Sequence, residues 1–314
     1  MKSNTTVLNI AHRGARAYAP ENTLIAFAKA LTFACDMVEL DVRLSKDGEI
    51  VVYHDEHLLR CTDAKAKYPD RGNYQVSDFT IAELSILDAG SWYVEQLSLE
   101  NEQRQAFLQS LTEAEIAEFV SASERDLYAS GTIKIPTLTE ALDLAIKLGL
   151  MVNVELKKTE DGQRLVNAVL QLIKTMNLED KILISSFEHD LLAKVRQQNK
   201  TITTAILVDE PIKAPVTYLR NLKANAYNFG TYHHYKQNGF GTLLGRRYLS
   251  QISKIKKSRF GLNVWTCNDP EEMRYLLNAG VTGIISDFPN RVRAELDRYL
   301  TYIDSVTDTV SADN

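Results

Sequence analysis

The chain has 314 residues, of which 45% are hydrophobic and 25% charged, and its formal net charge at pH 7 is -5. This length can hold two average domains or one large α/β barrel, and the apolar content is enough for a substantial core. The mild acidic excess argues against a nucleic-acid partner, because nucleic-acid binders present a basic face. No stretch approaches the roughly 20 apolar residues of a membrane-spanning segment. None of these properties predicts an oligomeric state.

The N-terminal segment and the cysteines favour a cytoplasmic protein. Residues 1–6 lead directly into a predicted strand, without the apolar stretch and small-residue cleavage site of a signal peptide. Cys35, Cys61 and Cys267 are odd in number and lack metal-binding spacing, which fits a reducing compartment. We expect all three to be buried thiols.

Alternation of strand and helix is the dominant pattern in the chain. Short apolar runs predict strands at 7–11, 37–44, 151–156, 181–187, 203–208, 226–229, 262–266 and 283–286. Segments with helical periodicity predict helices at 22–34, 137–149, 163–176, 190–198, 216–222, 246–256, 271–278 and 291–300. Eight such units predict an α/β fold, the TIM (β/α)8 barrel. An open doubly wound sheet is the alternative, but no glycine-rich phosphate loop follows a strand.

One long segment interrupts this pattern between the second strand and the second helix. Residues 47–135 begin with a predicted hairpin, whose clearest strand is 49–53, and continue with polar, helical sequence. Within them, 98–128 has apolar residues at helical spacing on a Glu- and Gln-rich background, which is typical of a solvated cap. The predicted organisation is therefore a barrel of residues 1–46 and 136–304, a helical and hairpin insertion of 47–135 over the barrel mouth, and a flexible tail of 305–314. We expect removal of the cap to leave a folded barrel.

Ionisable residues end three of the predicted barrel strands. They are His12 and Arg13, Glu39 and Asp41, and Glu155 and Lys157. Side chains alternate faces along a strand, so each of the last two pairs shares a face, and strand ends converge at the catalytic end of a barrel. Three carboxylates suit Mg²⁺ or Ca²⁺ better than zinc, because no Cys or His stands at metal-binding spacing.

Positive and titratable groups accompany these carboxylates. Arg13 and Lys157 supply fixed charge for an anion such as phosphate. His12, together with His54 from the insertion, can serve as general acid and base near neutral pH. The combination points to phosphoryl chemistry. Two alternatives stay open. Glu155 and Lys157 could form only an ion pair with each other. The segment 232–235, Tyr-His-His-Tyr, could line the pocket instead of belonging to a surface loop.

A series of short motifs then carries a family resemblance. In order they are His12-Arg13-Gly14, Pro20-Glu21-Asn22-Thr23, Glu39-Leu40-Asp41-Val42, Asp47-Gly48, His54-Asp55, Ile135-Pro136-Thr137-Leu138, Glu155-Leu156-Lys157, Val264-Trp265-Thr266 and Asp287-Phe288-Pro289. This order resembles the glycerophosphodiester phosphodiesterase family from Ala11 to Pro289. The resemblance implies a barrel with a small insertion after the second strand.

The resemblance also implies roles for individual residues. Glu39, Asp41 and Glu155 would bind the metal, and His12 and His54 would be the acid and base. Arg13 and Lys157 would contact phosphate, Glu21 would order the site, and Trp265 would close over the glycerol end of the substrate. The chain departs from the family pattern in its longer insertion and in Arg60-Cys61-Thr62, where arginine-threonine-threonine is common.

The function implied is metal-dependent hydrolysis of small glycerophosphodiesters to sn-glycerol 3-phosphate and an alcohol. In the mechanism that the family suggests, the substrate's own 2-hydroxyl attacks phosphorus and a cyclic phosphate forms before water opens it. Two alternative functions remain open. One is lysophospholipase D-type activity on lysophospholipids or cleavage of an inositol-linked headgroup, and the other is a catalytically silent barrel that binds phosphodiesters.

Overall fold

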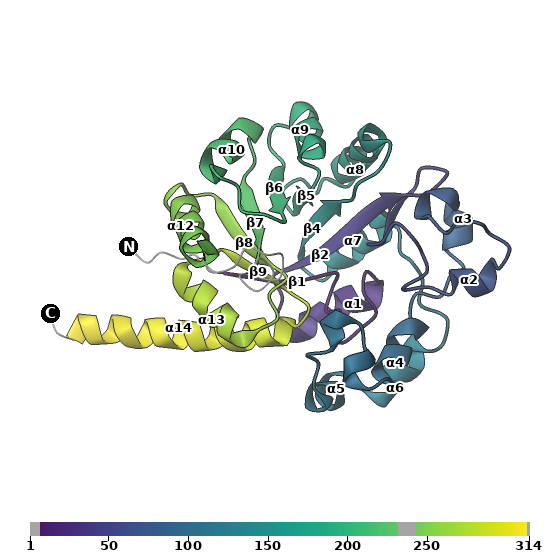
Figure 1. The fold of residues 1–314 in the computed structure, drawn as a ribbon, viewed down its shortest axis with the longest axis horizontal. Coiled ribbons are helices and arrows are strands. Elements are labelled where there is room, and N and C mark those ends of the chain that lie inside the picture. The colour runs from purple at the N-terminus through teal and green to yellow at the C-terminus, as the bar shows by residue number, and fades with distance from the viewer. Residues whose placement is uncertain (1–6, 232–242, 313–314) are drawn as a thin grey trace.

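A computed structural model, which describes residues 7–231 and 243–312, has a closed barrel of eight parallel strands within those ranges (Figure 1). The barrel strands are β1 (Leu8–Ala11), β2 (Met37–Leu44), β4 (Met151–Leu156), β5 (Ile182–Ser186), β6 (Thr203–Val208), β7 (Ala226–Gly230), β8 (Gly261–Trp265) and β9 (Gly283–Ser286). They pair in chain order, and β1 closes the ring by pairing with both β2 and β9. The predicted TIM barrel is confirmed.

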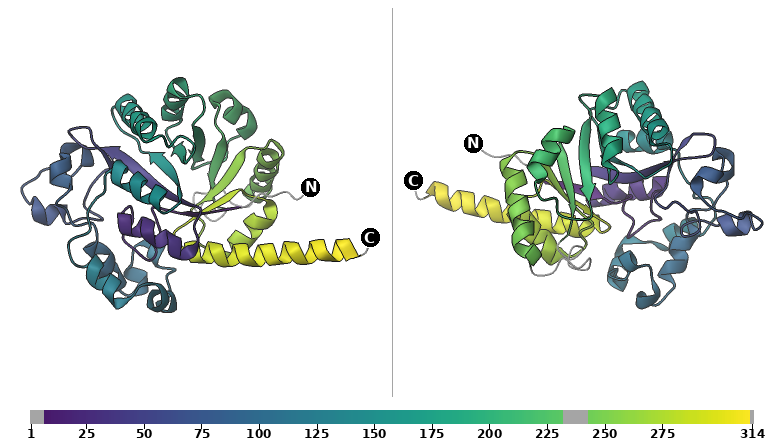
Figure 2. Two further views of the ribbon diagram at one scale, coloured as in Figure 1. Left: turned by 180° about the vertical axis from the view of Figure 1, so that it is seen from behind. Right: turned by 45° about the horizontal axis from the view of Figure 1, so that its top comes forward.

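Helices cover the outside of the barrel, as Figures 1 and 2 show. Those that follow the barrel strands are α1 (Leu24–Lys29), α7 (Leu138–Lys147), α8 (Gly162–Met176), α9 (His189–Gln198), α10 (Pro215–Leu222), α12 (Leu243–Lys257), α13 (Pro270–Ala279) and α14 (Pro289–Ala312). The short 3-10 helix η1 (Ala30–Phe33) continues α1. Thr137 and Glu140 form the reciprocal capping box that begins α7.

The alternation of side chains along β2 and β4 determines what faces the barrel interior. On β2, Val38, Leu40 and Val42 join the large apolar core between sheet and helices, while Met37 belongs to a separate small cluster. That small cluster takes one residue from each of six barrel strands: Ile10, Met37, Leu183, Ala205, Ala226 and Ile285. Glu39 and Asp41 share the face of Met37, because they follow it at intervals of two residues. The apolar interior therefore gives way to acidic side chains toward the carboxyl ends of the strands.

The insertion begins with a strand that extends the sheet. This strand, β3 (Ile50–Val52), pairs antiparallel with the end of β2. Short helices follow: α2 (Ala64–Lys67), η2 (Val76–Asp78), α3 (Ile81–Leu84), α4 (Ser91–Leu97), η3 (Asn101–Gln103), η4 (Ala106–Leu108), α5 (Glu113–Phe119) and α6 (Ala122–Tyr128). Figure 1 shows α4, α5 and α6 grouped beside α1. The division at residues 47 and 135 stays a prediction.

The helices of the insertion pack directly against the barrel's first loop. Phe119 of α5 makes edge contacts with the rings of Tyr18 and Phe33, at centroid distances of 5.1 Å to each. The hydroxyl of Tyr93 donates to the carbonyl of Ala17 at 2.6 Å, and the hydroxyl of Tyr128 donates to the carbonyl of Tyr18 at 3.3 Å. Because these residues belong to the same apolar core as the barrel, the segment is more than a solvated cap.

Deleting residues 99–129 with a short glycine-serine bridge should therefore destabilise the whole protein. The deletion would uncover Tyr18 and Phe33, and the loss of even one buried aromatic side chain costs about 3–5 kcal/mol. We expect aggregation or a much lower Tm in size-exclusion chromatography and thermal unfolding. A monomeric deletion protein with the wild-type Tm would restore the expectation of a separable cap.

The C-terminal helix is longer than the sequence indicated. Residues 305–314 were expected to form a flexible tail, but α14 continues to Ala312, and Figure 1 shows its last turns extending away from the barrel. No glycine or proline follows Pro289 in this stretch, so nothing in the backbone ends the helical hydrogen-bond series. Polar composition alone was a poor guide to where the helix ends.

Two further expectations concern the same described ranges. All three cysteines are free and buried, as predicted. No helix there combines the length and the apolar character needed to cross a membrane. The cytoplasmic location stays a prediction.

Candidate active site

The loop that follows β1 brings its backbone onto the β2 carboxylates. Arg13 and Gly14 have left-handed φ values of 56° and 78°, which turn the chain sharply after His12. This turn directs the backbone N–H of Arg13 to Glu39 Oε2 at 2.9 Å. Asn22, which also has a positive φ of 55°, donates from its side chain to Asp41 Oδ2 at 2.8 Å. The loop therefore fixes one oxygen of each carboxylate.

Gly14 is the position in this turn where a side chain is least tolerable. A Cβ there would lie 2.6 Å from the carbonyl carbon of Ala26 in α1, in addition to the strain of a positive φ. The conformation alone costs a non-glycine residue about 1–3 kcal/mol. Gly14→Ala should accordingly lower Tm by several degrees, measured by calorimetry. Gly72→Ala, where a Cβ meets no atom within 4 Å, should leave Tm unchanged; equal Tm values for the two variants would contradict this account.

Three carboxylates from β2 and β4 form one cluster. Asp41 and Glu155 are paired in the parallel register of these strands, and Glu39 stands one interior position before Asp41. Each of the three residues offers an oxygen that lies within 4.8 Å of the others, and all three are buried. Among the described residues Glu39 Oε1 has no hydrogen-bond partner, and Asp41 Oδ1 accepts no hydrogen bond and has only the Lys157 ammonium within ion-pair distance. Buried carboxylates left in this state are costly unless a cation joins them.

The electrostatics of the cluster reflect this crowding. Burial and the neighbouring Asp41 and Glu155 raise the pKa of Glu39 well above its ordinary value. Burial also raises the pKa of Glu155 to about 6, although Lys157 opposes the shift. For Asp41, burial is outweighed by Lys157 and its other positive neighbours, which hold the pKa below its usual range. The donor set of hard oxygens, partly unpartnered, fits a divalent metal ion.

Arg13 and Lys157 approach different oxygens of Asp41 in this cluster. The Arg13 guanidinium donates to Glu21 Oε1 at 2.8 Å, and its Nε lies 3.3 Å from Asp41 Oδ2. Lys157 Nζ lies 2.6 Å from Glu155 Oε1 and 3.4 Å from Asp41 Oδ1. Lys157 is thus an ion-pair partner of Glu155, as the alternative interpretation held, and it also faces the cavity.

Each histidine is bound at Nδ1 by an aspartate. His12 Nδ1 lies 2.7 Å from Asp287 Oδ1, and His54 Nδ1 lies 2.5 Å from Asp55 Oδ1. A carboxylate can only accept, so Nδ1 carries the proton in both neutral rings and Nε2 is left as the basic nitrogen. His12 Nε2 lies 3.9 Å from Glu39 Oε2.

The two imidazoles are held mainly in their neutral form. Burial, with Arg16 and Arg13 nearby, lowers the pKa of His12 to about 4. Burial also lowers the pKa of His54, although Asp41 and Asp55 act in the opposite direction. Both rings are therefore able to accept a proton at neutral pH.

These groups line a single cavity of about 170 Å³ at the carboxyl ends of the strands. Its lining contains His12, Arg13, Arg16, Glu39, His54, Asn153, Glu155, Lys157, Ser185, Phe187, Leu207, Trp265, Thr266 and Ile285. Trp265 and Phe187 contact each other edge to face, at a centroid distance of 5.1 Å, and give the cavity an aromatic side. The structure thus brings together seven of the nine predicted site residues, with Asp41 and Glu21 directly behind them.

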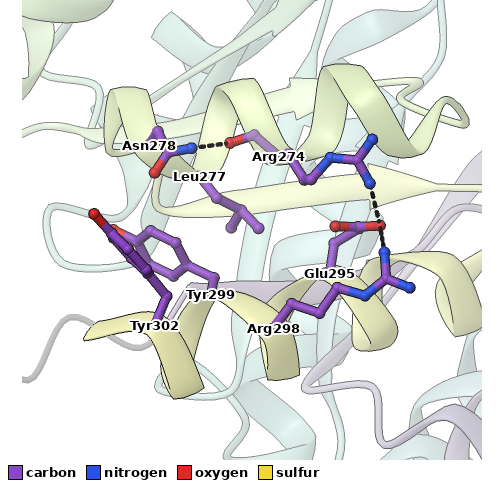
Figure 3. Close-up of a pocket in the computed structure, with 7 residues that line it drawn as sticks. All are labelled: Arg274, Leu277, Asn278, Glu295, Arg298, Tyr299 and Tyr302. Atoms are coloured by element: carbon purple, nitrogen blue, oxygen red, sulfur yellow. Dashed lines mark hydrogen bonds and ion pairs between the residues drawn. The ribbon is translucent and has the colours of Figure 1, made fainter. Parts of the chain in front are cut away.

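A larger groove of about 310 Å³ lies between α13 and α14, and Figure 3 shows its lining. There Glu295 accepts from Arg274 at 3.0 Å and from Arg298 at 2.8 Å. No predicted site residue borders it. Size alone therefore does not indicate where the candidate active site lies, whereas carboxylates, histidines and cations converge only weakly there and strongly on the smaller cavity.

Several supporting residues received no role from the sequence. Asn22, Asp55 and Asp287 stand within the motifs but were not assigned, and Arg16 was not noticed. The rule that ionisable residues at strand ends converge would have found Asp287, which directly follows β9. Arg16 carries no such signal, because it lies within an irregular loop. Residues 232–235 lie outside the described residues.

A barrel with these groups at one mouth is the architecture of an enzyme that acts on an anionic substrate. The family model of the glycerophosphoryl diester phosphodiesterase family matches residues 12–291, and the chain belongs to this family. It is therefore a phosphoric diester hydrolase by family.

Relatives and solved structures agree with this membership. The chain is 30% identical over 283 residues to the glycerophosphodiester phosphodiesterase of Bacillus altitudinis, covering 90% of this chain and 94% of that protein. It is 31% identical over 286 residues to the enzyme of the same name from Caldanaerobacter subterraneus, with 90% and 94% covered. An Oleispira antarctica phosphodiesterase, solved in complex with the product sn-glycerol-3-phosphate, matches with a TM-score of 0.71 and 27% identity, covering 92% of this chain and 96% of that one.

Proposed function

We propose that this enzyme hydrolyses glycerophosphodiesters to sn-glycerol 3-phosphate and an alcohol, with His12 and His54 as acid and base and with Mg²⁺ or Ca²⁺ as cofactor. The observation that carries the proposal is the placement of both imidazoles on the cavity that also exposes Glu39, Glu155, Arg13 and Lys157. Family membership supports the reaction, and the product held by the Oleispira antarctica relative supports the glycerol phosphate half of the substrate.

The carboxylate cluster supports the cofactor assignment. Glu39, Asp41 and Glu155 would hold the metal ion, since their oxygens lie together and two of them lack hydrogen-bond partners. A divalent ion bound there would offset negative charge on the phosphoryl group. Oxygen ligands of this kind suit magnesium or calcium rather than zinc.

The histidines would move the protons of the reaction. One imidazole takes the proton from the 2-hydroxyl of the substrate's glycerol, whose oxygen then forms a bond to phosphorus. The bond from phosphorus to the alcohol breaks, and the second imidazole, protonated beforehand, gives its proton to the departing oxygen. The resulting cyclic glycerol phosphate is opened by water with the two roles reversed. Both rings suit this exchange because Asp287 and Asp55 fix their Nδ1 atoms and leave Nε2 free.

The remaining residues would bind and orient the substrate. Arg13 and Lys157 carry fixed positive charge toward the phosphate, where such charge contributes most to rate. Glu21 orders Arg13 through their hydrogen bond of 2.8 Å. Trp265, held by its indole N–H to the carbonyl of Asn228 at 3.1 Å, would cover the glycerol end.

A substrate panel tests the proposal and its alternatives. Purified enzyme would be given the choline, ethanolamine, glycerol and inositol diesters of glycerol 3-phosphate, and lysophosphatidylcholine, with release of sn-glycerol 3-phosphate and of lysophosphatidic acid as readouts. We expect turnover of one or more small diesters. Turnover of the lysolipid alone would replace the proposal by lysophospholipase D activity, and binding of diesters without turnover would make the chain a silent barrel.

A further inference from the structure

A continuous series of ion pairs and hydrogen bonds connects the two histidines of the site. Each histidine is bound by an aspartate, each aspartate by an arginine, and both arginines meet on one buried glutamate. In order, the series runs through His12, Asp287, Arg16, Glu21, Arg60, Asp55 and His54. Arg60, Asp55 and His54 belong to the insertion. Of the insertion's described residues, His54 alone lines the cavity.

Arg60 is the residue that joins the insertion to the barrel in this series. Its Nε and one terminal nitrogen donate to the two oxygens of Asp55, at 2.6 and 3.0 Å. Its terminal nitrogens also donate to the two oxygens of Glu21, at 2.6 and 3.1 Å. A planar guanidinium can bind two carboxylates along two of its edges, whereas the single ammonium of lysine cannot reproduce that fork.

Both carboxylates that Arg60 binds also contact residues that line the cavity. Asp55 is only partly buried, with 24% of its side chain exposed, and it binds His54 at Nδ1. Without Arg60 this carboxylate would be free to turn into solvent and release the imidazole. Glu21, with 3% of its side chain exposed, receives Arg13 on the same oxygen that Arg60 binds. The orientation of His54 and that of Arg13 therefore depend on one guanidinium.

Neighbouring residues of the insertion support the two arginines of the series. Gln105 accepts from a terminal nitrogen of Arg60 at 3.1 Å. The ring of Phe107 lies 4.0 Å from the guanidinium carbon of Arg16, within range of a cation–π contact. The segment around η4 thus contacts both halves of the series.

We propose that Arg60 is a positioning residue for the hydrolysis, and that through it the insertion holds His54 and Arg13 in the arrangement the reaction needs. The proposal rests on the proposed function, in which His54 exchanges a proton with the substrate. Arg60 lies behind the residues that line the cavity and acts through Asp55 and Glu21.

Replacing Arg60 by lysine tests this role, because the charge stays and the fork is lost. We expect kcat for the preferred diester to fall roughly 10- to 100-fold, the scale of a misplaced catalytic group, with KM changed less than about threefold. The matched control is Arg71→Lys: Arg71 also pairs with a glutamate of the insertion, Glu83, and packs on the Phe79 ring, but it does not reach the series. Its kcat should stay at the wild-type value.

A double-mutant cycle with Asp55 separates positioning from general stability. Asp55→Asn should lower kcat to a similar degree, and the Arg60→Lys, Asp55→Asn enzyme should be little worse than either single variant, because both changes break the same link. Any of three results would overturn the proposal. The Arg60→Lys enzyme could keep the wild-type kcat, or Arg71→Lys could lower kcat as much as Arg60→Lys does. In the third, the fall in kcat of the double variant would equal the product of the two single falls. Should Arg60→Lys fail to fold, wild-type kcat in Asp55→Asn would overturn it instead. His54→Ala serves as the reference: if that enzyme keeps its activity, it is the proposed function that fails.

Discussion

Replacing His54 by alanine should lower kcat by about 100-fold or more, the scale expected for loss of a general acid or base. The effect should fall on turnover rather than folding, because His54 is partly exposed and its neighbours Asp55 and Arg60 remain paired without it. Replacing His12 should have an effect of the same size. Steady-state kinetics and thermal unfolding of both variants measure the two quantities separately.

Another histidine of the insertion provides the control. His57 is exposed and lies only three residues after His54, yet it does not border the cavity. His57→Ala should therefore keep wild-type turnover. If either His12→Ala or His54→Ala were as active as His57→Ala, the proton-transfer role of that residue would be wrong.

Replacing Glu155 by glutamine should raise the metal concentration needed for half-maximal activity by roughly 10-fold or more, since even the loss of a group that only orients a metal ligand costs about 10- to 100-fold in affinity. The substitution removes one of three anionic oxygens from the cluster and leaves a neutral amide in nearly the same shape. Activity titrated against added Mg²⁺ or Ca²⁺ measures the midpoint.

The competing explanation for Glu155 is that it serves only as the ion-pair partner of Lys157. If Glu155 served only as that partner, the variant would lose stability while its metal midpoint stayed at the wild-type value. Glu160→Gln, an exposed carboxylate in the loop that follows β4, should change neither quantity.

Much of the fold followed from the sequence because its signals are local. The strand from Met37 to Leu44 and the one from Met151 to Leu156 were predicted at their observed bounds, since an apolar run buried on one face is interrupted at every second position by acidic or amide groups. The same alternation predicts that Glu39, Asp41 and Glu155 lie together, because parallel strands of a barrel end on one rim.

The parts that the sequence did not predict depend on contacts between distant residues. Phe119 follows Tyr18 by about a hundred residues, and helical spacing alone does not reveal that their rings meet. Likewise, Glu21 is the point where Arg13, Arg16 and Arg60 converge, but their positions in irregular loops give no periodic signal. Apolar spacing in the insertion correctly predicted helices there and could not indicate what those helices cover.

The proposed reaction requires a divalent ion on the carboxylate cluster and two histidines beside it for hydrolysis of a glycerophosphodiester. The most direct test is to strip the purified enzyme with a chelator, remove the chelator, and measure release of sn-glycerol 3-phosphate from its preferred diester before and after adding back Mg²⁺ or Ca²⁺. We predict loss of activity on stripping and recovery with one of these ions, but no recovery in the Glu39→Gln enzyme. Full activity in the stripped protein would contradict the claim.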